Sequence, residues 1–261
     1  MATYTTPDGI GKGLFLHLAN QTHLLIAGAS GSGKSVLLNG IISTLLYRFP
    51  LDVAGGAQFV LIDPKRVELY PYRNLPHTLC YACEPTDMVE ALKYAMRVCE
   101  TRYEDMQLRG LRKYDGADIY VVIEELADLM TTNKRAVQPL IQRLCQIGRA
   151  SRIHVVCLTQ CPLARILTTE IKVNFDGIVA LRTRSAQDSR NIIGVNGAER
   201  LPQYGECLYY CPEFMAVHHY KVPYIDEDEQ KRLIQWWEAQ KETEKEEDGF
   251  FTRLFGRRKQ K

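Results

Sequence analysis

The chain has 261 residues, of which 46% are hydrophobic and 25% are charged, and its formal net charge is +2. This composition is ordinary for a soluble globular protein, and the length allows one large or two small domains. The near-neutral charge excludes a global basic signature of nucleic-acid binding. No apolar run approaches the roughly 18 residues of a membrane span, and the N-terminus lacks a signal-peptide stretch, so we expect a cytoplasmic protein.

After a polar lead-in over residues 1–19, with an extended piece expected at 14–18, the first strong motif lies in residues 24–38. An apolar strand-like run enters a glycine-rich loop, and an apolar helix-like run leaves it. The loop matches G-x-x-x-x-G-K-[ST] in the strand–loop–helix context of a phosphate-binding loop, rather than a glycine-rich turn that binds nothing. Its residues are Gly28, Ala29, Ser30, Gly31, Ser32, Gly33, Lys34 and Ser35.

This loop predicts a site for ATP and Mg²⁺. Glycines let the backbone fold around a polyphosphate and turn its N–H groups inward, and the helix that begins near Lys34 adds its positive dipole end. The Lys34 ammonium can reach the β- and γ-phosphates, and the Ser35 hydroxyl can hold Mg²⁺. The apolar spacing of the following residues continues the helix towards Pro50.

The next predicted strand, 59–62, ends in Asp63-Pro64-Lys65. Charged residues at this end of a parallel strand lie where α/β sheets bind ligands, but a turn followed by a helix cap fits equally well. Prolines make residues 71–86 loop-rich, and a helix is expected over 86–110. The single C-x-x-C pair at Cys80 and Cys83 is a weak zinc signal.

A further apolar strand, 119–123, runs directly into Glu124 and Glu125. After a phosphate loop, this pattern is typical of a Walker B element: one acid supports the water shell of Mg²⁺ and the next polarises the attacking water. A pair of acids at the N-terminus of a helix is the alternative interpretation.

The rest of the main body continues the alternation of helices and strands. A helix at 137–147 precedes Gly148 and Arg149, and a strand at 153–158 ends in Thr159 and Gln160, whose polar groups could sense the γ-phosphate. Strands at 175–181, 208–210 and 216–220 follow. This order predicts an α/β fold of the RecA-like P-loop NTPase class, a mostly parallel sheet with helices on both faces.

Residues 226–261 form a charged helix and a basic-aromatic tail. The side chains Leu233, Ile234, Trp236 and Trp237 predict one turn of docking surface. Residues 249–261 hold five basic residues and no acid, which leaves a formal charge of −3 for residues 1–248. This tail could be a partner-protein contact, a membrane-surface anchor, a phosphate-backbone contact or a disordered end.

The chain resembles the motor domain of the FtsK/SpoIIIE family of DNA-pumping ATPases over about residues 20–225. The phosphate loop alone is generic. More specific are the stretches IDPKRVEL, ELADLM and RASRIH, which occur in the order of the family, as do SAQDSRNIIG and the GAERLPQYGECLYY stretch. The resemblance implies one motor domain, 20–225, between the lead-in and the tail.

Residue roles follow from the same resemblance. Lys34 and Ser35 would bind phosphate and Mg²⁺, Glu124 stands at the Walker B aspartate, and Glu125 stands at the catalytic glutamate. Gln160 is similar to the polar sensor after the strand. Arg149 matches an arginine finger offered across a subunit interface, which implies a homo-oligomeric ring, most simply a hexamer, with double-stranded DNA in its channel.

Two departures from the family pattern stand out. Glu124 is one methylene longer than aspartate, which could slow turnover, and Cys161 replaces a common arginine. The implied function is an ATP-driven translocase of double-stranded DNA in conjugative or mobile-element transfer, or in chromosome or plasmid partitioning. The alternatives are an ATPase that energises protein secretion and a nucleotide-gated scaffold with little turnover.

Overall fold

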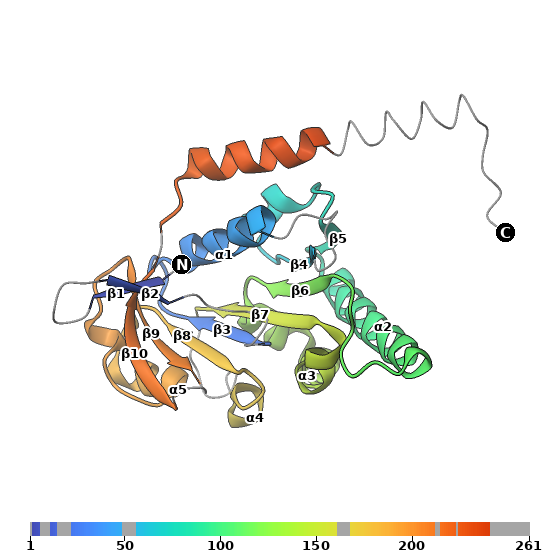
Figure 1. Ribbon diagram of the computed structural model, residues 1–261. Helices are drawn as coiled ribbons and strands as arrows, with labels where there is room; N and C mark the ends of the chain where they lie inside the picture. Colours follow the sequence, from blue (N-terminus) through green and yellow to red (C-terminus); the bar gives the residue numbers. More distant parts are fainter. Residues whose placement is uncertain are drawn as a thin grey trace.

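The structure is a computed structural model, and it describes residues 2–5, 11–14, 22–48, 56–160, 168–211, 215–222 and 224–240. Ten strands form one sheet in the order β2-β1-β10-β9-β8-β3-β7-β6-β4-β5 (Figure 1). Cys161 and the tail 249–261, as well as most of the extended piece expected at 14–18, lie outside the described residues.

The strands are β1 (Ala2–Thr5), β2 (Gly11–Leu14), β3 (Leu24–Ala27), β4 (Ala57–Ile62), β5 (Thr78–Ala82), β6 (Asp118–Ile123), β7 (Ile153–Thr159), β8 (Gly177–Ala180), β9 (Glu206–Cys211) and β10 (Ala216–Lys221). The α-helices are α1 (Lys34–Arg48), α2 (Pro85–Arg109), α3 (Leu126–Ser151), α4 (Thr169–Lys172) and α5 (Ala186–Ile193), with 3₁₀ turns η1 (Tyr70–Tyr72) and η2 (Ala198–Arg200). A further helix covers residues 227–240.

The six strands from β8 to β5 in this order are parallel, and β9, β10, β1 and β2 extend the sheet in antiparallel fashion. Strands β3, β6 and β7 are buried along their whole length, as expected of central parallel strands covered on both faces. Because these strands are parallel, the segments that follow β3, β4, β6 and β7 all leave from one edge of the sheet.

Helices cover both faces of the sheet, as the sequence predicted (Figure 1). On one face, alternate strand residues such as Leu25, Val121 and Val155 pack against α2, α3 and α5. On the other, their neighbours such as Leu24 and Val122 pack against α1, η1 and helix 227–240. Within the described residues, no helix has the length and apolar character needed to cross a membrane.

Several predicted bounds needed correction. The helix expected at 137–147 is the C-terminal part of α3, which begins directly after the acid pair and continues through a non-helical residue, Asn133, and through Pro139. Residues 71–86 were predicted to be loop-rich, yet Thr78–Ala82 form β5 at the edge of the sheet. The lead-in also contributes β1 and β2, which pair with β10 and with each other.

Helix 227–240 docks on the α1 face through one side; the predicted docking surface is confirmed for Leu233, Ile234 and Trp237 and was wrong for Trp236. Ile234 and Trp237 are buried, whereas Trp236 is 54% exposed. The Trp237 ring meets the His77 ring edge-on with centroids 4.3 Å apart, and Gln230 Nε2 donates to the Tyr72 hydroxyl at 2.6 Å. The helix is thereby held to the η1–β5 segment.

The same contact predicts a specific acid sensitivity. His77 is 0% exposed, and neither ring nitrogen has a hydrogen-bond partner among the described residues. Burial lowers its pKa from 6.5 to about 4. Between these two pH values the imidazole is mostly protonated in the unfolded chain and mostly neutral in the folded chain, so acidification favours unfolding. We expect this difference to lower the free energy of unfolding by about 2 kcal/mol when the pH falls from 7 to 5.

Replacing the imidazole by an apolar ring, His77→Phe, should remove this part of the pH dependence, since no hydrogen bond is lost. The measurement is urea unfolding at pH 7 and pH 5, where His77→Phe should lose less stability on acidification than the wild type. His218→Phe, at an exposed position of β10, serves as the control and should follow the wild type. Identical pH slopes for His77→Phe and the wild type would contradict the burial argument.

Candidate functional site

The phosphate loop is anchored at both sides of β3. Gly28 N donates to the Thr159 carbonyl at 3.3 Å, and Ala29 N donates to the Arg182 carbonyl at 2.8 Å. A Cβ at Gly28 would lie 2.7 Å from Ser32 Oγ and 2.9 Å from Leu181 Cβ, so only glycine fits there. The loop is thus held between the end of β7 and the segment that follows β8.

Lys34 begins α1 beneath this loop. Its ammonium is buried and donates to the carbonyls of Gly28 at 2.9 Å and Ala29 at 2.7 Å. Burial lowers its pKa to about 8, while the nearby Glu125 carboxylate opposes that change. The Ser32 hydroxyl is buried and has no hydrogen-bond partner among the described residues. A cation and an unsatisfied hydroxyl inside a glycine loop fit the binding of a polyphosphate.

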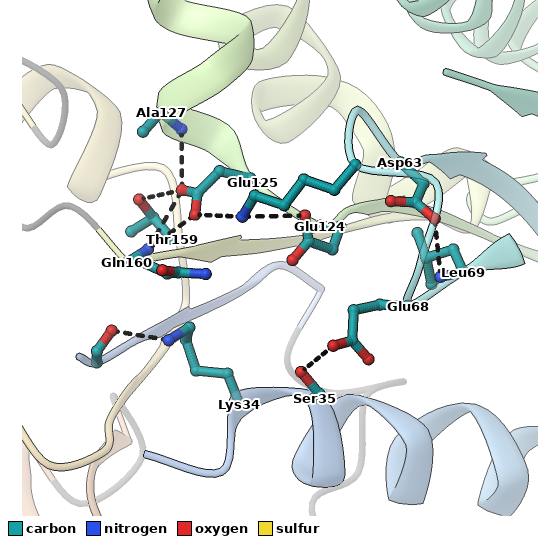
Figure 2. Close-up of polar contacts among 12 residues, drawn as sticks. Lys34, Ser35, Asp63, Glu68, Leu69, Glu124, Glu125, Ala127, Thr159 and Gln160 are labelled. Atoms are coloured by element: carbon teal, nitrogen blue, oxygen red, sulfur yellow. Dashed lines mark hydrogen bonds and ion pairs between the residues drawn. The ribbon is translucent and has the colours of Figure 1, made fainter. Parts of the chain in front are cut away.

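The Glu125 carboxylate is 4% exposed and is held by four donors (Figure 2). Glu125 is the N-cap of α3, so its side chain accepts from Ala127 N at 3.3 Å. Thr159 Oγ1 donates at 2.8 Å, Gln160 N donates to both oxygens at 3.2 Å, and Lys65 Nζ donates at 3.3 Å. The acid pair therefore follows a central strand and stands at the start of a helix, as its position in the sequence predicted; its role in binding Mg²⁺ and activating water stays a prediction.

Glu124 is buried with a very different environment. Its Oε2 has no hydrogen bond within the described residues, and its ionic contact is with Lys65 Nζ at 3.6 Å. Burial raises the pKa of this carboxyl to about 7, against the opposing effect of Lys65, and the charge of Glu125 raises it further. A carboxylate oxygen that lacks a hydrogen bond and lies beside a phosphate loop suits the binding of a cation or of its water shell.

The loop between β4 and η1 supplies two groups to the site that the sequence analysis did not assign. Lys65 reaches the acid pair, and Glu68 Oε1 accepts from the Ser35 hydroxyl at 2.7 Å. Asp63 has a structural role, because its Oδ2 accepts from Leu69 N at 3.0 Å and closes the loop. The available signal was the I-D-P-K-x-x-E-L stretch, whose spacing alone does not show where its charges point.

The predicted site residues separate into two locations. Lys34, Ser35, Glu124, Glu125 and Gln160 lie together at the carboxyl edge of the sheet (Figure 2). Arg149 is exposed in the last turn of α3, the helix that begins at the acid pair. The kinked helix α3 ends beside the start of β7, and β7 runs roughly 20 Å back to Thr159 beside Glu125, so Arg149 cannot reach the acid pair of its own chain.

The donor set fits Mg²⁺ better than a metal that needs a full protein cage. In the described residues, no group of three or more His, Cys, Asp or Glu is arranged to hold a metal ion. Magnesium usually keeps several waters and binds through one or two protein groups plus substrate phosphates. Ser35 and Glu124 can provide those groups beside the phosphate loop.

Comparisons with known proteins agree on the family. The family model described as FtsK/SpoIIIE matches residues 3–119 and 117–164. The DNA translocase FtsK of Chlorobaculum tepidum is 41% identical over 228 residues, which are 80% of this chain and 28% of that protein. The DNA translocase FtsK of Helicobacter pylori is 34% identical over 255 residues, 92% of this chain and 30% of that protein. The chain thus spans about a third of the length of these relatives.

Solved structures share the fold at lower sequence identity. The pCW3 conjugation coupling protein TcpA, in a monomer form with ATPgS, superimposes with a TM-score of 0.75 at 22% identity, covering 90% of this chain and 69% of that one. EssC (ATPases 2 and 3) from Geobacillus thermodenitrificans superimposes with a TM-score of 0.76 at 14% identity, covering 91% and 48%. These likenesses establish a P-loop ATPase fold.

The packing of the phosphate loop predicts opposite outcomes for two glycines. In Gly28→Ala the new methyl group would push against Leu181 and the Arg182 backbone, so we expect at least tenfold weaker ATP binding. In Gly40→Ala, within α1, a Cβ meets nothing within 4 Å, and the greater helix propensity of alanine should stabilise the fold by about 0.5–1 kcal/mol. Calorimetric titration with ATP and thermal unfolding of both variants check this. Equal ATP affinity in both would show that the loop tolerates the displacement.

Proposed function

Because this chain belongs to the FtsK/SpoIIIE family, we propose that it is an ATP hydrolase that drives double-stranded DNA. The curated relatives named as DNA translocases support the substrate, and the P-loop ATPase fold supports the use of nucleotide. The main observation behind the proposal is the environment of Glu125. Four hydrogen-bond donors fix its buried carboxylate beside the phosphate loop.

In this proposal the phosphate loop and Lys34 bind the β- and γ-phosphates of ATP. The Lys34 ammonium would exchange its two loop carbonyls for phosphate oxygens, which compensate its burial better because they are charged. Ser35 and Glu124 would hold Mg²⁺. When bound, the cation neutralises charge on the transferring phosphoryl group.

Glu125 would orient the attacking water and accept its proton. Its hydrogen bonds fix the carboxylate without reorganisation, which is the condition for efficient general-base catalysis in a buried site. Gln160 would sense the γ-phosphate, because its side chain lies between Thr159 and Lys34 (Figure 2). The longer side chain of Glu124, compared with aspartate, would place the cation less tightly and slow turnover without abolishing it.

The site would be completed by a neighbouring copy in a homo-oligomeric ring, which we take to be a hexamer around DNA. Arg149 supports this part of the proposal, since it is exposed and far from its own Glu125. We place the motor in the cytoplasm, in conjugative or mobile-element DNA transfer or in chromosome or plasmid partitioning.

The direct test is ATP hydrolysis with and without long duplex DNA. We expect DNA to raise turnover of the wild type, Lys34→Ala to abolish it, and Glu125→Gln to lower it about 100-fold or more while ATP still binds. Thermal unfolding confirms that each variant is folded. Turnover that needs Lys34 but ignores DNA would point instead to a protein cargo, and normal ATP binding with near-background turnover would point to a nucleotide-gated scaffold.

A mixing experiment tests whether Arg149 acts across an interface. Arg149→Ala and Lys34→Ala chains should each be inactive alone, whereas an equal mixture should regain activity, because roughly a quarter of the ring interfaces pair an intact Lys34 with an intact Arg149. Arg143→Ala, at another exposed arginine of α3, serves as the control and should hydrolyse ATP like the wild type. No recovery in mixed rings would place the function of Arg149 elsewhere.

A further inference from the structure

The Ser35 hydroxyl donates a hydrogen bond to a carboxylate that does not belong to the acid pair after β6. Ser35 Oγ donates to Glu68 Oε1 at 2.7 Å, in a half-buried contact between the start of α1 and the loop before η1 (Figure 2). The two residues are 33 positions apart in the chain. This pair is the point at which the β4–η1 loop meets the phosphate loop.

Glu68 is aimed at Ser35 by a well-held backbone. The next residue, Leu69, is 0% exposed and donates its N–H to the buried Asp63 carboxylate at 3.0 Å. At the other side of the loop, Arg66 N donates to the Asp63 carbonyl at 3.2 Å. The loop that carries Glu68 is therefore closed on itself by hydrogen bonds to both the side chain and the backbone of Asp63.

The Walker B position does not make this contact. Glu124 Oε2 lies 3.6 Å from Lys65 Nζ and has no hydrogen bond among the described residues, and Lys65 also donates to Glu125. Lys65 therefore contacts both acids of the pair. The Ser35 hydroxyl is bonded instead to Glu68, which lies in the same β4–η1 loop as Lys65.

A hydroxyl that donates its hydrogen to a carboxylate turns its oxygen lone pairs the opposite way, where a cation can use them. Partners of this kind orient metal ligands and raise their basicity. We propose that Glu68 is a positioning residue for Mg²⁺: it holds the Ser35 hydroxyl with its lone pairs towards the cation. The inference rests on the proposed function, since it needs ATP and Mg²⁺ at this site.

The test is the binding of a fluorescent ATP analogue in the presence of Mg²⁺ and in excess EDTA. Glu68→Met keeps the side-chain length but removes the acceptor, so Mg²⁺-free affinity should stay within about twofold and the tightening by Mg²⁺ should fall about tenfold. Glu68→Gln keeps an acceptor oxygen, so it should retain part of that tightening. Glu84→Met, at an exposed acid that pairs with Arg66 beyond the site, should match the wild type.

A double-mutant cycle separates positioning from an independent role. If Glu68 acts through the serine, Glu68→Met adds nothing to the Mg²⁺ dependence once Ser35→Ala is present. An equal further loss in that background, or unchanged Mg²⁺ tightening in both Glu68→Met and Glu68→Gln, would overturn the proposal. A wild-type chain that binds no ATP under either condition would instead reject the proposed function.

Discussion

A single buried carboxylate, that of Glu125, is the point at which three separate parts of the chain meet. It accepts from the first turn of α3, from the end of β7 and from Lys65 in the loop after β4. An ionised carboxylate that is 4% exposed is very costly unless donors surround it. The relative placement of these segments, and hence of the carboxyl edge of the sheet, depends on satisfying this one charge.

Glu124 shows what happens when that condition is not met. The two acids are adjacent and almost equally buried, yet Glu124 has an oxygen without a hydrogen bond within the described structure, and burial raises its pKa to about 7. The difference arises because Glu125, and not Glu124, is the N-cap of α3, so that Ala127 N in the first turn of the helix and the end of β7 donate to Glu125. One acid is thus held by four donors, and its neighbour keeps a buried oxygen without a hydrogen bond among the described residues.

Much of this arrangement could be predicted from local sequence patterns. The phosphate loop, the central strands and the acid pair are each contained in a short stretch, where spacing and apolar runs determine local structure. The parallel sheet then follows, and it brings the ends of β3, β6 and β7 to one edge. For this reason Lys34, Ser35, Glu124, Glu125 and Gln160 lie together at this edge, while their roles stay a prediction.

The contacts of Lys65 and Glu68 could not be predicted from local sequence patterns, because the partner of each lies far away in the sequence. Lys65 contacts an acid 60 positions later, and Glu68 contacts a serine 33 positions earlier. Their directions are set by the fold of the Asp63–Leu69 loop, which depends on a buried hydrogen bond and not on any periodic pattern. Likewise, β5 was missed because its pairing with β4 outweighs the loop tendency of the surrounding prolines.

The position of Arg149 follows from the same architecture. The α3 helix starts at the carboxyl edge of the sheet and ends at the opposite edge, where Gly148 lies so close to β7 that a Cβ would be 2.4 Å from the Ile153 carbonyl. Strand β7 then returns to the carboxyl edge at Thr159, over roughly 20 Å. An arginine in this turn is held at a fixed place on the far side of its own subunit, so any phosphate it contacts must belong to another molecule.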